Sequence, residues 1–328
     1  MERLLRHATL ASVLAVLAAL AAGSAHAQNY PEKSIRFIAP YPPGGTTDLL
    51  TRTIGQKLSE QLGQPVVVEN RAGAGGNVGA EVAAKAPPDG YTILMAPISP
   101  MAINVSLYGS KLAFNPERDF VPIVLVAKSP LVITVHPSVP AKTLKELIAV
   151  ARAHPGKMTY GSSGSGSSNH LMGELFKALA KVDIIHVPYK GGAPAAVALV
   201  SGETDMAVLQ IPTLLPHYRS GRIRPIVISG TRRSPAIPEI PYAGETGFKG
   251  LESTSWYVIV APSRTPRFIV DKLHATLTKI LASADIRNRL TAEGAILEDM
   301  TPDELKTFIR SEVDKWAQAV KFSGAKVD

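Results

Sequence analysis

Short runs of consecutive apolar residues alternate along this chain with longer segments in which apolar residues recur every three or four positions. An uninterrupted apolar run is typical of a buried strand, whereas the longer spacing is typical of a helix with one buried face. We therefore predict strands over residues 35–39, 65–69, 91–95, 131–135, 184–187, 206–210, 223–229 and 256–260. We predict helices over residues 49–58, 78–85, 143–154, 169–180, 266–281 and 302–322.

Capping signals support two of these helices. Thr143 with Glu146, and Thr301 with Glu304, each form the pattern of a capping box at a helix start. Strand, short glycine-rich turn and helix then repeat along the chain, which is the order of a parallel sheet covered by helices on both faces. Because the chain has 328 residues, we expect an α/β protein of roughly two domains.

The first 27 residues have the features of an export signal. Arg3 and Arg6 precede an apolar run over residues 8–23, and Ala25 and Ala27 supply the small residues that a signal peptidase recognises before its cleavage site. The run is shorter than the about 20 residues that a spanning helix needs. We expect cleavage after Ala27 and export to the periplasm.

Composition narrows the possible chemistry. The chain has no cysteine, which excludes disulfides, thiolate metal sites and a cysteine nucleophile. Its histidines are too far apart to form a local metal motif. Lys and Arg number 35 against 27 Asp and Glu, a net charge of +8 that suits anionic partners. The basic residues are scattered, so nucleic acid is not specifically favoured, and we expect neither a cofactor nor a metal.

Two turns carry the main chemical signal. Residues 40–47 and 161–168 are rich in glycine and hydroxyl side chains, and each lies between a predicted strand and a predicted helix. Backbone N–H groups at a helix start lack intrahelical partners and lie at the positive end of the helix dipole. Each turn therefore predicts a site for a carboxylate or another oxyanion. The alternative for either turn alone is a structural turn with a helix cap.

A series of motifs runs along the chain from behind the export signal nearly to the C-terminus. They are Tyr41-Pro-Pro-Gly-Gly45 with Asp48, Val68-Glu-Asn-Arg-Ala-Gly-Ala-Gly-Gly-Asn77, Pro88-Asp-Gly-Tyr-Thr92, Asp119-Phe120, Gly161-Ser162 through His170-Leu171, Val187-Pro-Tyr-Lys-Gly191 and Trp256. In these motifs and in their order the chain resembles the Bug proteins, the solute-binding proteins of tripartite tricarboxylate transporters.

The resemblance implies a two-lobed periplasmic binding protein of type II, a Venus flytrap in which each lobe is a mainly parallel sheet flanked by helices. The chain would cross between lobes near residues 127–130 and 227–230. Domain I would then comprise residues 30–128 plus 229–328, and domain II residues 129–228. The family's solutes are di- and tricarboxylates, acidic amino acids and aromatic acids, which it delivers to membrane subunits of the transporter. We expect a monomer without enzymatic activity.

The resemblance also assigns a binding site without a cationic side chain. It implies carboxylate contacts at Gly44, Gly45, Thr46, Ser162, Ser163 and Gly164, and cleft walls at Tyr41, Ser99, Ser167 and Asn169. Gln210 stands where relatives often carry Asp or Asn.

Two other functions remain open at the sequence level. An exported serine hydrolase would use Ser163 or Ser165 with His170 or His186, but no nucleophile motif surrounds these serines. A ligand-sensing receptor for a two-component system would keep the same fold with a different membrane partner.

Overall fold

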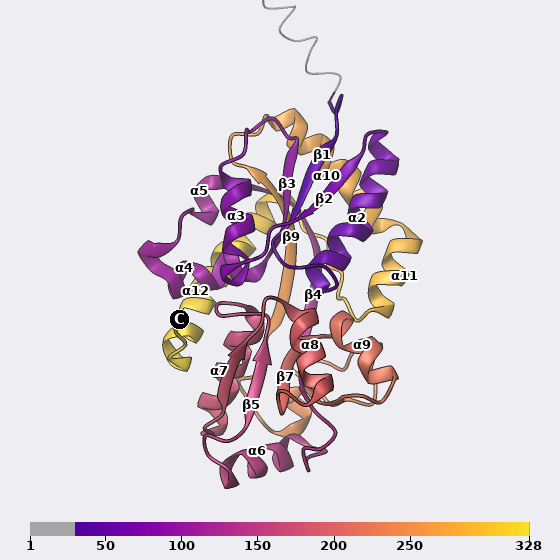
Figure 1. Ribbon diagram of the computed structural model, residues 1–328. Coiled ribbons are helices and arrows are strands. Elements are labelled where there is room, and N and C mark those ends of the chain that lie inside the picture. Colours follow the sequence, from indigo (N-terminus) through magenta and orange to yellow (C-terminus); the bar gives the residue numbers. More distant parts are fainter. Residues whose placement is uncertain (1–29, 328) are drawn as a thin grey trace, which may run out of the picture.

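A computed structural model describes residues 30–327 of the chain. The expected signal peptide therefore lies outside the described residues. The described chain forms two lobes, stacked one above the other in Figure 1 and linked by the long strands β4 and β9.

Nine strands run through both lobes in the order β2-β1-β3-β9-β4-β7-β5-β6, and β8 pairs with β4 beside this path. Their bounds are Ile35–Ala39 for β1, Val66–Asn70 for β2, Thr92–Pro97 for β3, Phe120–Val135 for β4, Thr159–Ser162 for β5, Ile185–Pro188 for β6, Met206–Gln210 for β7, Arg224–Ile228 for β8 and Thr254–Pro262 for β9.

The predicted parallel pairing holds for part of the sheet in each lobe. Strand β1 pairs in parallel with β2 and β3, and β5 pairs in parallel with β6 and β7. Strands β4, β8 and β9 instead join antiparallel. The sheets are therefore mixed, because the two strands that cross between lobes run in opposite directions beside each other.

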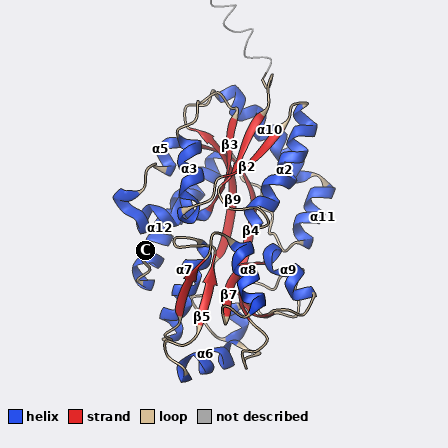
Figure 2. Cartoon of the chain, in the orientation of Figure 1, coloured by secondary structure: helices blue, strands red, loops and turns tan. Residues whose placement is uncertain are grey.

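Helices cover both faces of each sheet (Figure 2). Their bounds are Thr46–Leu62 for α2, Asn77–Ala84 for α3, Asn104–Tyr108 for α4, Pro116–Asp119 for α5, Leu144–Ala153 for α6, Ser168–Ala180 for α7, Gly192–Ser201 for α8, Ile211–Arg219 for α9, Arg267–Ala282 for α10, Ala284–Ala292 for α11 and Pro302–Ser323 for α12. Both predicted capping boxes are confirmed, at the starts of α6 and α12. Within residues 30–327, no helix combines the length and apolar character needed to cross a membrane.

The long strand β4 differs from the prediction of a strand confined to residues 131–135. It continues unbroken from Phe120 to Val135, although Lys128, Ser129 and Pro130 lie in its middle. Its first part pairs with β9 as far as Pro130, and its last part pairs with β7 from Leu131 onward. Because β4 pairs first with β9 and then with β7, these polar and proline residues stay in an extended conformation.

The segment between β8 and β9 packs beside the strands of the second sheet. After β8, Ile237 and Ile240 pack into the apolar cluster around β7 and α8, and Ala243 and Leu251 pack into the cluster around α6 and α7. The segment before β9 thus belongs with the second sheet. Its few apolar residues are irregularly spaced, so the sequence pattern does not reveal where it packs.

Candidate functional site

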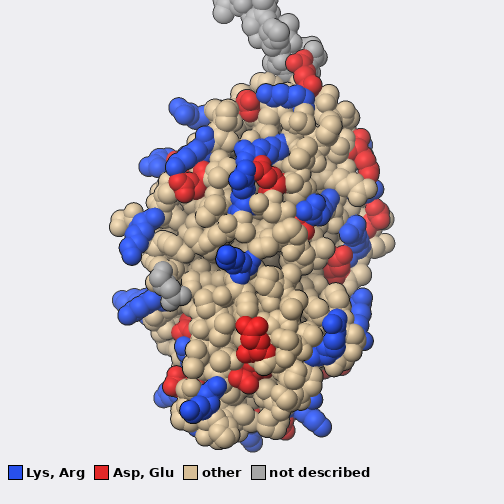
Figure 3. Space-filling model, in the orientation of Figure 1, with Lys and Arg blue, Asp and Glu red and all other residues tan. Residues whose placement is uncertain are grey.

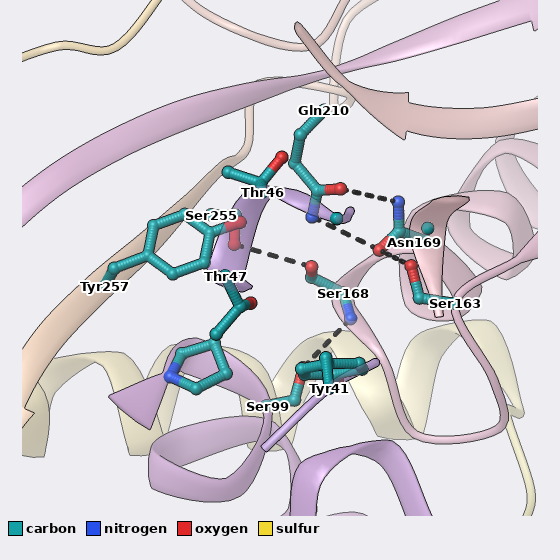
Figure 4. Close-up of a pocket in the computed structure, with 13 residues that line it drawn as sticks. Tyr41, Thr46, Thr47, Ser99, Ser163, Ser168, Asn169, Gln210, Ser255 and Tyr257 are labelled. Carbon is teal, nitrogen blue, oxygen red and sulfur yellow. Dashed lines mark hydrogen bonds between the residues drawn. The ribbon is translucent and has the colours of Figure 1, made fainter. Parts of the chain in front are cut away.

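A small pocket lies where the two lobes meet (Figure 4). It encloses about 20 Å³, enough for about one water molecule, so the lobes lie in a tightly closed arrangement. None of the described residues that line it is a lysine, arginine, aspartate or glutamate. The lining residues are Tyr41, Gly45, Thr46, Thr47, Pro97, Ser99, Ser163, Ser168, Asn169, Gly192, Gln210, Ser255 and Tyr257.

The N-terminus of helix α2 forms the first-lobe side of this pocket. Gly45 is its N-cap and offers no side-chain cap, and the first intrahelical bond is donated by Leu49 to the Gly45 carbonyl at 3.0 Å. None of the described groups accepts a hydrogen bond from the N–H of Thr46 or Thr47. The α2 terminus therefore presents free donors and a positive dipole end to the pocket.

The N-terminus of helix α8 forms the opposing side. Its N-cap is Gly191, with a φ of 134°, and again no side chain caps the helix. Gly192 and Ala193 supply the first N–H groups, while Pro194 has none. A Cβ built on Gly45 would lie 3.9 Å from the Gly192 nitrogen. Two uncapped helix starts, one from each lobe, thus face each other across the pocket.

The turn before helix α7 satisfies most of its own donors. The Ser167 hydroxyl caps α7 by accepting from the His170 N–H at 3.1 Å. The Gly164 N–H donates to the Ser162 hydroxyl at 3.1 Å, and the Gly166 N–H donates to His170 Nδ1 at 3.2 Å. The Ser168 N–H donates across the lobe boundary to the Ser99 hydroxyl at 3.1 Å. This turn therefore supports the pocket wall more than it offers free donors.

Asn169 uses all of its hydrogen-bonding capacity within the protein. Its amide nitrogen donates to the Val208 carbonyl at 2.7 Å and to Gln210 Oε1 at 3.3 Å. Its oxygen accepts from the Ser163 hydroxyl at 2.8 Å and from Gln210 Nε2 at 3.3 Å. An amide offers two donors and two lone pairs, so Asn169 acts as a positioning residue.

Strand β9 supplies the floor between the lobes. Ser255 and Tyr257 point into the pocket, and Ser255 lies 3.5 Å from the Ser168 hydroxyl (Figure 4). Burial raises the pKa of the Tyr257 phenol well above its usual range, against the opposing effect of nearby hydroxyl and amide donors. Burial likewise raises the pKa of Tyr41. Both phenols therefore stay neutral and keep their O–H groups at physiological pH.

Asp48 is a carboxylate close to the site, but its charge is balanced. It accepts from the Gly44 N–H and from Arg52 Nε, each at 3.0 Å, and from Asn70 Nδ2 at 2.9 Å. Burial acts to raise its pKa, but the bonds from Arg52, Asn70 and Gly44 outweigh it, so the pKa of Asp48 lies below its ordinary value. Asp48 thus fixes the first turn of α2.

Glycines form a close seam on both sides of the pocket. A Cβ on Gly75 would lie 2.9 Å from the Ser165 carbonyl oxygen of the other lobe. On the other side, a Cβ on Gly191 would lie 2.8 Å from Cδ of Pro42. At both positions the glycine backbone lies so close to the opposing lobe that a methyl group would not fit without a shift.

The structure brings together six of the ten residues that the sequence assigns to the site. Tyr41, Gly45, Thr46, Ser99, Ser163 and Asn169 line the pocket. Gly44, Ser162, Gly164 and Ser167 do not, and their polar groups bond to Asp48, His186, Ser162 and His170 instead.

Sequence reasoning does not assign Pro97, Ser168, Gly192, Ser255 or Tyr257 to the site, and it counts Thr47 only among the hydroxyl donors of the first turn. A signal for Gly192 exists: Gly191 and Gly192 follow a strand and precede an alanine-rich segment without any capping side chain. The strand period of two also places Ser255 and Tyr257 on one face of β9. Nothing in the sequence shows which lobe that face meets.

The serine–histidine contact expected for a hydrolase has a different form here. Ser163 bonds to Asn169, whereas His186 Nε2 lies 2.6 Å from the Ser162 hydroxyl, which is fully buried and also accepts from Gly164. Among residues 30–327, no three histidine, aspartate or glutamate side chains gather in a way that would hold a metal ion.

Comparisons with known proteins agree with this architecture. A family model described as the tripartite tricarboxylate transporter family receptor matches residues 50–324. BugT from Bordetella pertussis is 37% identical over 302 residues, which cover 92% of each chain. The solved structure of R. palustris Rpa4515 with adipate has a TM-score of 0.88 and 34% identity, and covers 91% of this chain and 100% of that one.

A second solved structure is also similar. MatC (Rpa3494) from Rhodopseudomonas palustris, with bound malate, has a TM-score of 0.85 and 33% identity, and covers 89% of this chain and all 100% of its own. The predicted fold class, a two-lobed periplasmic binding protein, is confirmed by these neighbours. The chain belongs to the tripartite tricarboxylate transporter receptor family of periplasmic solute-binding proteins.

Proposed function

We propose that this protein captures a small organic carboxylate between its lobes and presents the closed complex to a tripartite tricarboxylate-type transporter. One observation carries the proposal: the uncapped N-termini of α2 and α8, one from each lobe, converge on a single pocket. Each terminus favours an anion through its free N–H groups and its dipole.

The pocket suits an anion although it contains no formal positive charge. Hydroxyl and phenol groups of Thr47, Ser99 and Tyr257 add neutral donors beside the helix starts. Closure removes water, which strengthens each of these hydrogen bonds in the low-dielectric interior. Overall charge contributes less directly, because basic side chains are scattered among acidic ones on the face shown in Figure 3.

Opening and closing of the lobes admits and retains the ligand in this proposal. The lobes divide near Pro130 on β4 and Thr254 on β9, where the last pair between these strands lies. A ligand that contacts both helix starts favours the closed arrangement, since only there do both starts reach it. The 20 Å³ pocket must widen around any dicarboxylate, so the bound state is slightly more open than this one.

The chemical class of ligand follows from the neutral pocket and from the relatives. The two structural neighbours carry adipate and malate, which are both dicarboxylates. Tricarboxylates, acidic amino acids and aromatic acids remain within the proposed class. The protein would act as a monomer in the periplasm after cleavage behind Ala27.

A thermal-shift screen of the mature protein, starting at Gln28, tests this function. The panel comprises malate, adipate, citrate, glutamate and benzoate, each at several concentrations, with hits measured by calorimetry. At least one acid should raise the melting temperature, because a ligand that binds only the folded state stabilises it. A melting temperature unchanged by every carboxylate would overturn the proposal.

A further inference from the structure

The hinge strand β9 has a second face that the ligand pocket does not use. Ser255 and Tyr257 line the pocket, while their neighbours Thr254 and Trp256 line a cavity on the other side. Successive residues of a strand point to opposite faces, so this cavity lies behind the hinge. Trp256 is held there by a hydrogen bond from its Nε1 to Glu312 at 2.9 Å.

An adjoining cavity of about 300 Å³ shares Arg232 and Ile296 with it. Its walls come from both lobes. Arg232 follows β8, in the segment that packs on the second sheet through Ile237 and Ile240. Arg287 lies on α11, whose Ile286 and Leu290 belong to the core of the first lobe.

Two guanidinium groups in this cavity have no neutralising partner. Arg233 bonds to Glu245 at 2.8 and 3.0 Å and to the Pro238 carbonyl at 2.9 Å. Neither Arg232 nor Arg287 makes a side-chain hydrogen bond or ion pair within residues 30–327. No aspartate or glutamate is among the described residues that line the cavity.

Three acidic residues of α11 and of the loop that follows it are paired elsewhere. Asp285 lies 3.5 Å from Lys57, Glu293 lies 3.5 Å from Arg289, and Glu298 lies 2.6 Å from Lys128. These three carboxylates therefore do not neutralise Arg232 or Arg287. An anion from solution meets two arginines that form no ion pair with a described carboxylate.

Part of the remaining wall is apolar. Pro130, Pro235, Ile296 and Leu297 line the cavity, together with the hydroxyl residues Ser234 and Thr291. A wholly polar anion such as phosphate would leave the apolar part of the wall without a contact, whereas a carboxylate on a hydrocarbon body would cover it.

We propose that this cavity is a second anion site, at which a small organic carboxylate with an apolar body binds between Arg232 and Arg287. Guanidinium groups match the geometry of carboxylates and bind them by charge-assisted hydrogen bonds. Because the two arginines belong to different lobes, their spacing changes when the lobes rotate. The site is separate from the pocket between the helix starts and does not depend on the ligand proposed there.

The test uses 4-fluorobenzoate as probe, titrated into the mature protein and followed by fluorine NMR. The wild type should bind it, and Arg232→Gln and Arg287→Gln should each weaken that binding at least fivefold. Arg289→Gln is the matched control: it removes one charge from the same helix, but Arg289 does not line the cavity. The control should bind as the wild type does. Inorganic phosphate should compete poorly.

Three results would overturn the inference. They are absence of probe binding, equal weakening by all three arginine variants, and loss of binding only in Gly192→Val, whose change lies in the other pocket. Phosphate binding that equals that of the probe would contradict the role of the apolar wall. Loss of binding only in Gly192→Val would place the probe in the main pocket instead. The other results do not bear on the carboxylate proposed for that pocket, which the thermal-shift screen tests by itself.

Discussion

The turns at residues 40–47 and 161–168 are similar in sequence and different in use. Both follow a strand, contain glycines at positive φ and open a helix. The first leaves the N–H groups of Thr46 and Thr47 free, because Gly45 has no side chain to cap α2. In the second, Ser167 caps α7 and Ser162 accepts from Gly164. In the proposed function, the second turn that binds the anion is Gly191–Gly192, before α8.

This difference shows that a serine in a glycine-rich turn adds a hydroxyl group, but that its oxygen can also accept from a backbone N–H that would otherwise be free to bind a ligand. A serine oxygen at the N-cap satisfies a helix N–H that a glycine leaves to the ligand. Residues 161–168 thus position Ser163 and Asn169 in the wall, while the glycine caps at 45 and 191 provide the open amides.

The largest effect should come from closing the gap between the two open helix starts. Gly192 lines the pocket, so Gly192→Val would place a branched side chain in the space for the ligand. We expect at least a hundredfold loss of ligand affinity, or about 3 kcal/mol. A Cβ there meets the Ser163 and Thr213 hydroxyls at 3.5 Å, an ordinary contact, so the fold should persist. Calorimetry measures the affinity and circular dichroism the fold. Wild-type affinity would exclude α8 from the site.

The turn at residues 161–168, whose polar groups bond to one another, should contribute more to the free energy of unfolding than the first turn does. Asn169→Leu strips partners from the Val208 carbonyl, Ser163 and Gln210, and should lower the free energy of unfolding by about 2–3 kcal/mol. Thr47→Val is the matched change in the first turn. The Thr47 hydroxyl has no described partner, so urea unfolding should shift by less than about 0.5 kcal/mol. Equal losses of unfolding free energy in the two variants would show that the two turns do not differ in this respect.

For ligand affinity we expect the opposite order, with a larger effect from a change in the first turn than from a change in the second. Thr47→Val removes a free pocket hydroxyl and should weaken carboxylate binding about tenfold, or 1.4 kcal/mol. Ser162→Ala removes a hydroxyl that faces His186 and Gly164, and affinity should change less than about twofold. If Ser162→Ala weakens binding more than Thr47→Val, the second turn contacts the ligand directly.

The glycine seam offers a smaller test. Gly75→Ala places a methyl group against Ser165 of the other lobe and should weaken binding about fivefold, or 1 kcal/mol, mainly through faster dissociation. Gly63→Ala is its control, because Gly63 has a similar φ of 68° and nothing within 4 Å. Both variants carry the same backbone strain. Stopped-flow dissociation should therefore separate them, and equal rates would show that the seam does not limit closure.

The smallest effect concerns Asp48 and acid. Its folded-state pKa is depressed, so its stabilising contribution is present above its ordinary value of 3.8 and disappears as the pH falls through the folded-state pKa. Asp48→Asn should cost about 0.5–1 kcal/mol at pH 7 and almost nothing near pH 2. Urea unfolding at both pH values measures the difference. A cost that does not change with pH would assign it to packing.

Most strands could be predicted because their apolar runs are continuous and their turns are marked by glycine and proline. Helix α8 could not, since Ala195, Val197 and Leu199 leave no polar stripe to mark its period. Its capping glycines were visible but had no predicted helix to cap.

The site itself was partly predictable. The sequence shows that residues 40–47 and 161–168 have the composition of an anion cradle, but not whether a hydroxyl faces a ligand or its own backbone. That choice depends on side-chain torsions and on neighbours such as His186 and Val208, which lie far away in the sequence.

The seam at Gly75 and Gly191 has a consequence for how substrate range changes during evolution. A Cβ at Gly75 would meet main-chain atoms of Ser165 and Gly166, which no mutation can remove, and a Cβ at Gly191 would meet the ring of Pro42. New specificities must therefore arise by replacing the side chains that line the pocket between these two contacts, while selection keeps glycine at both contacts.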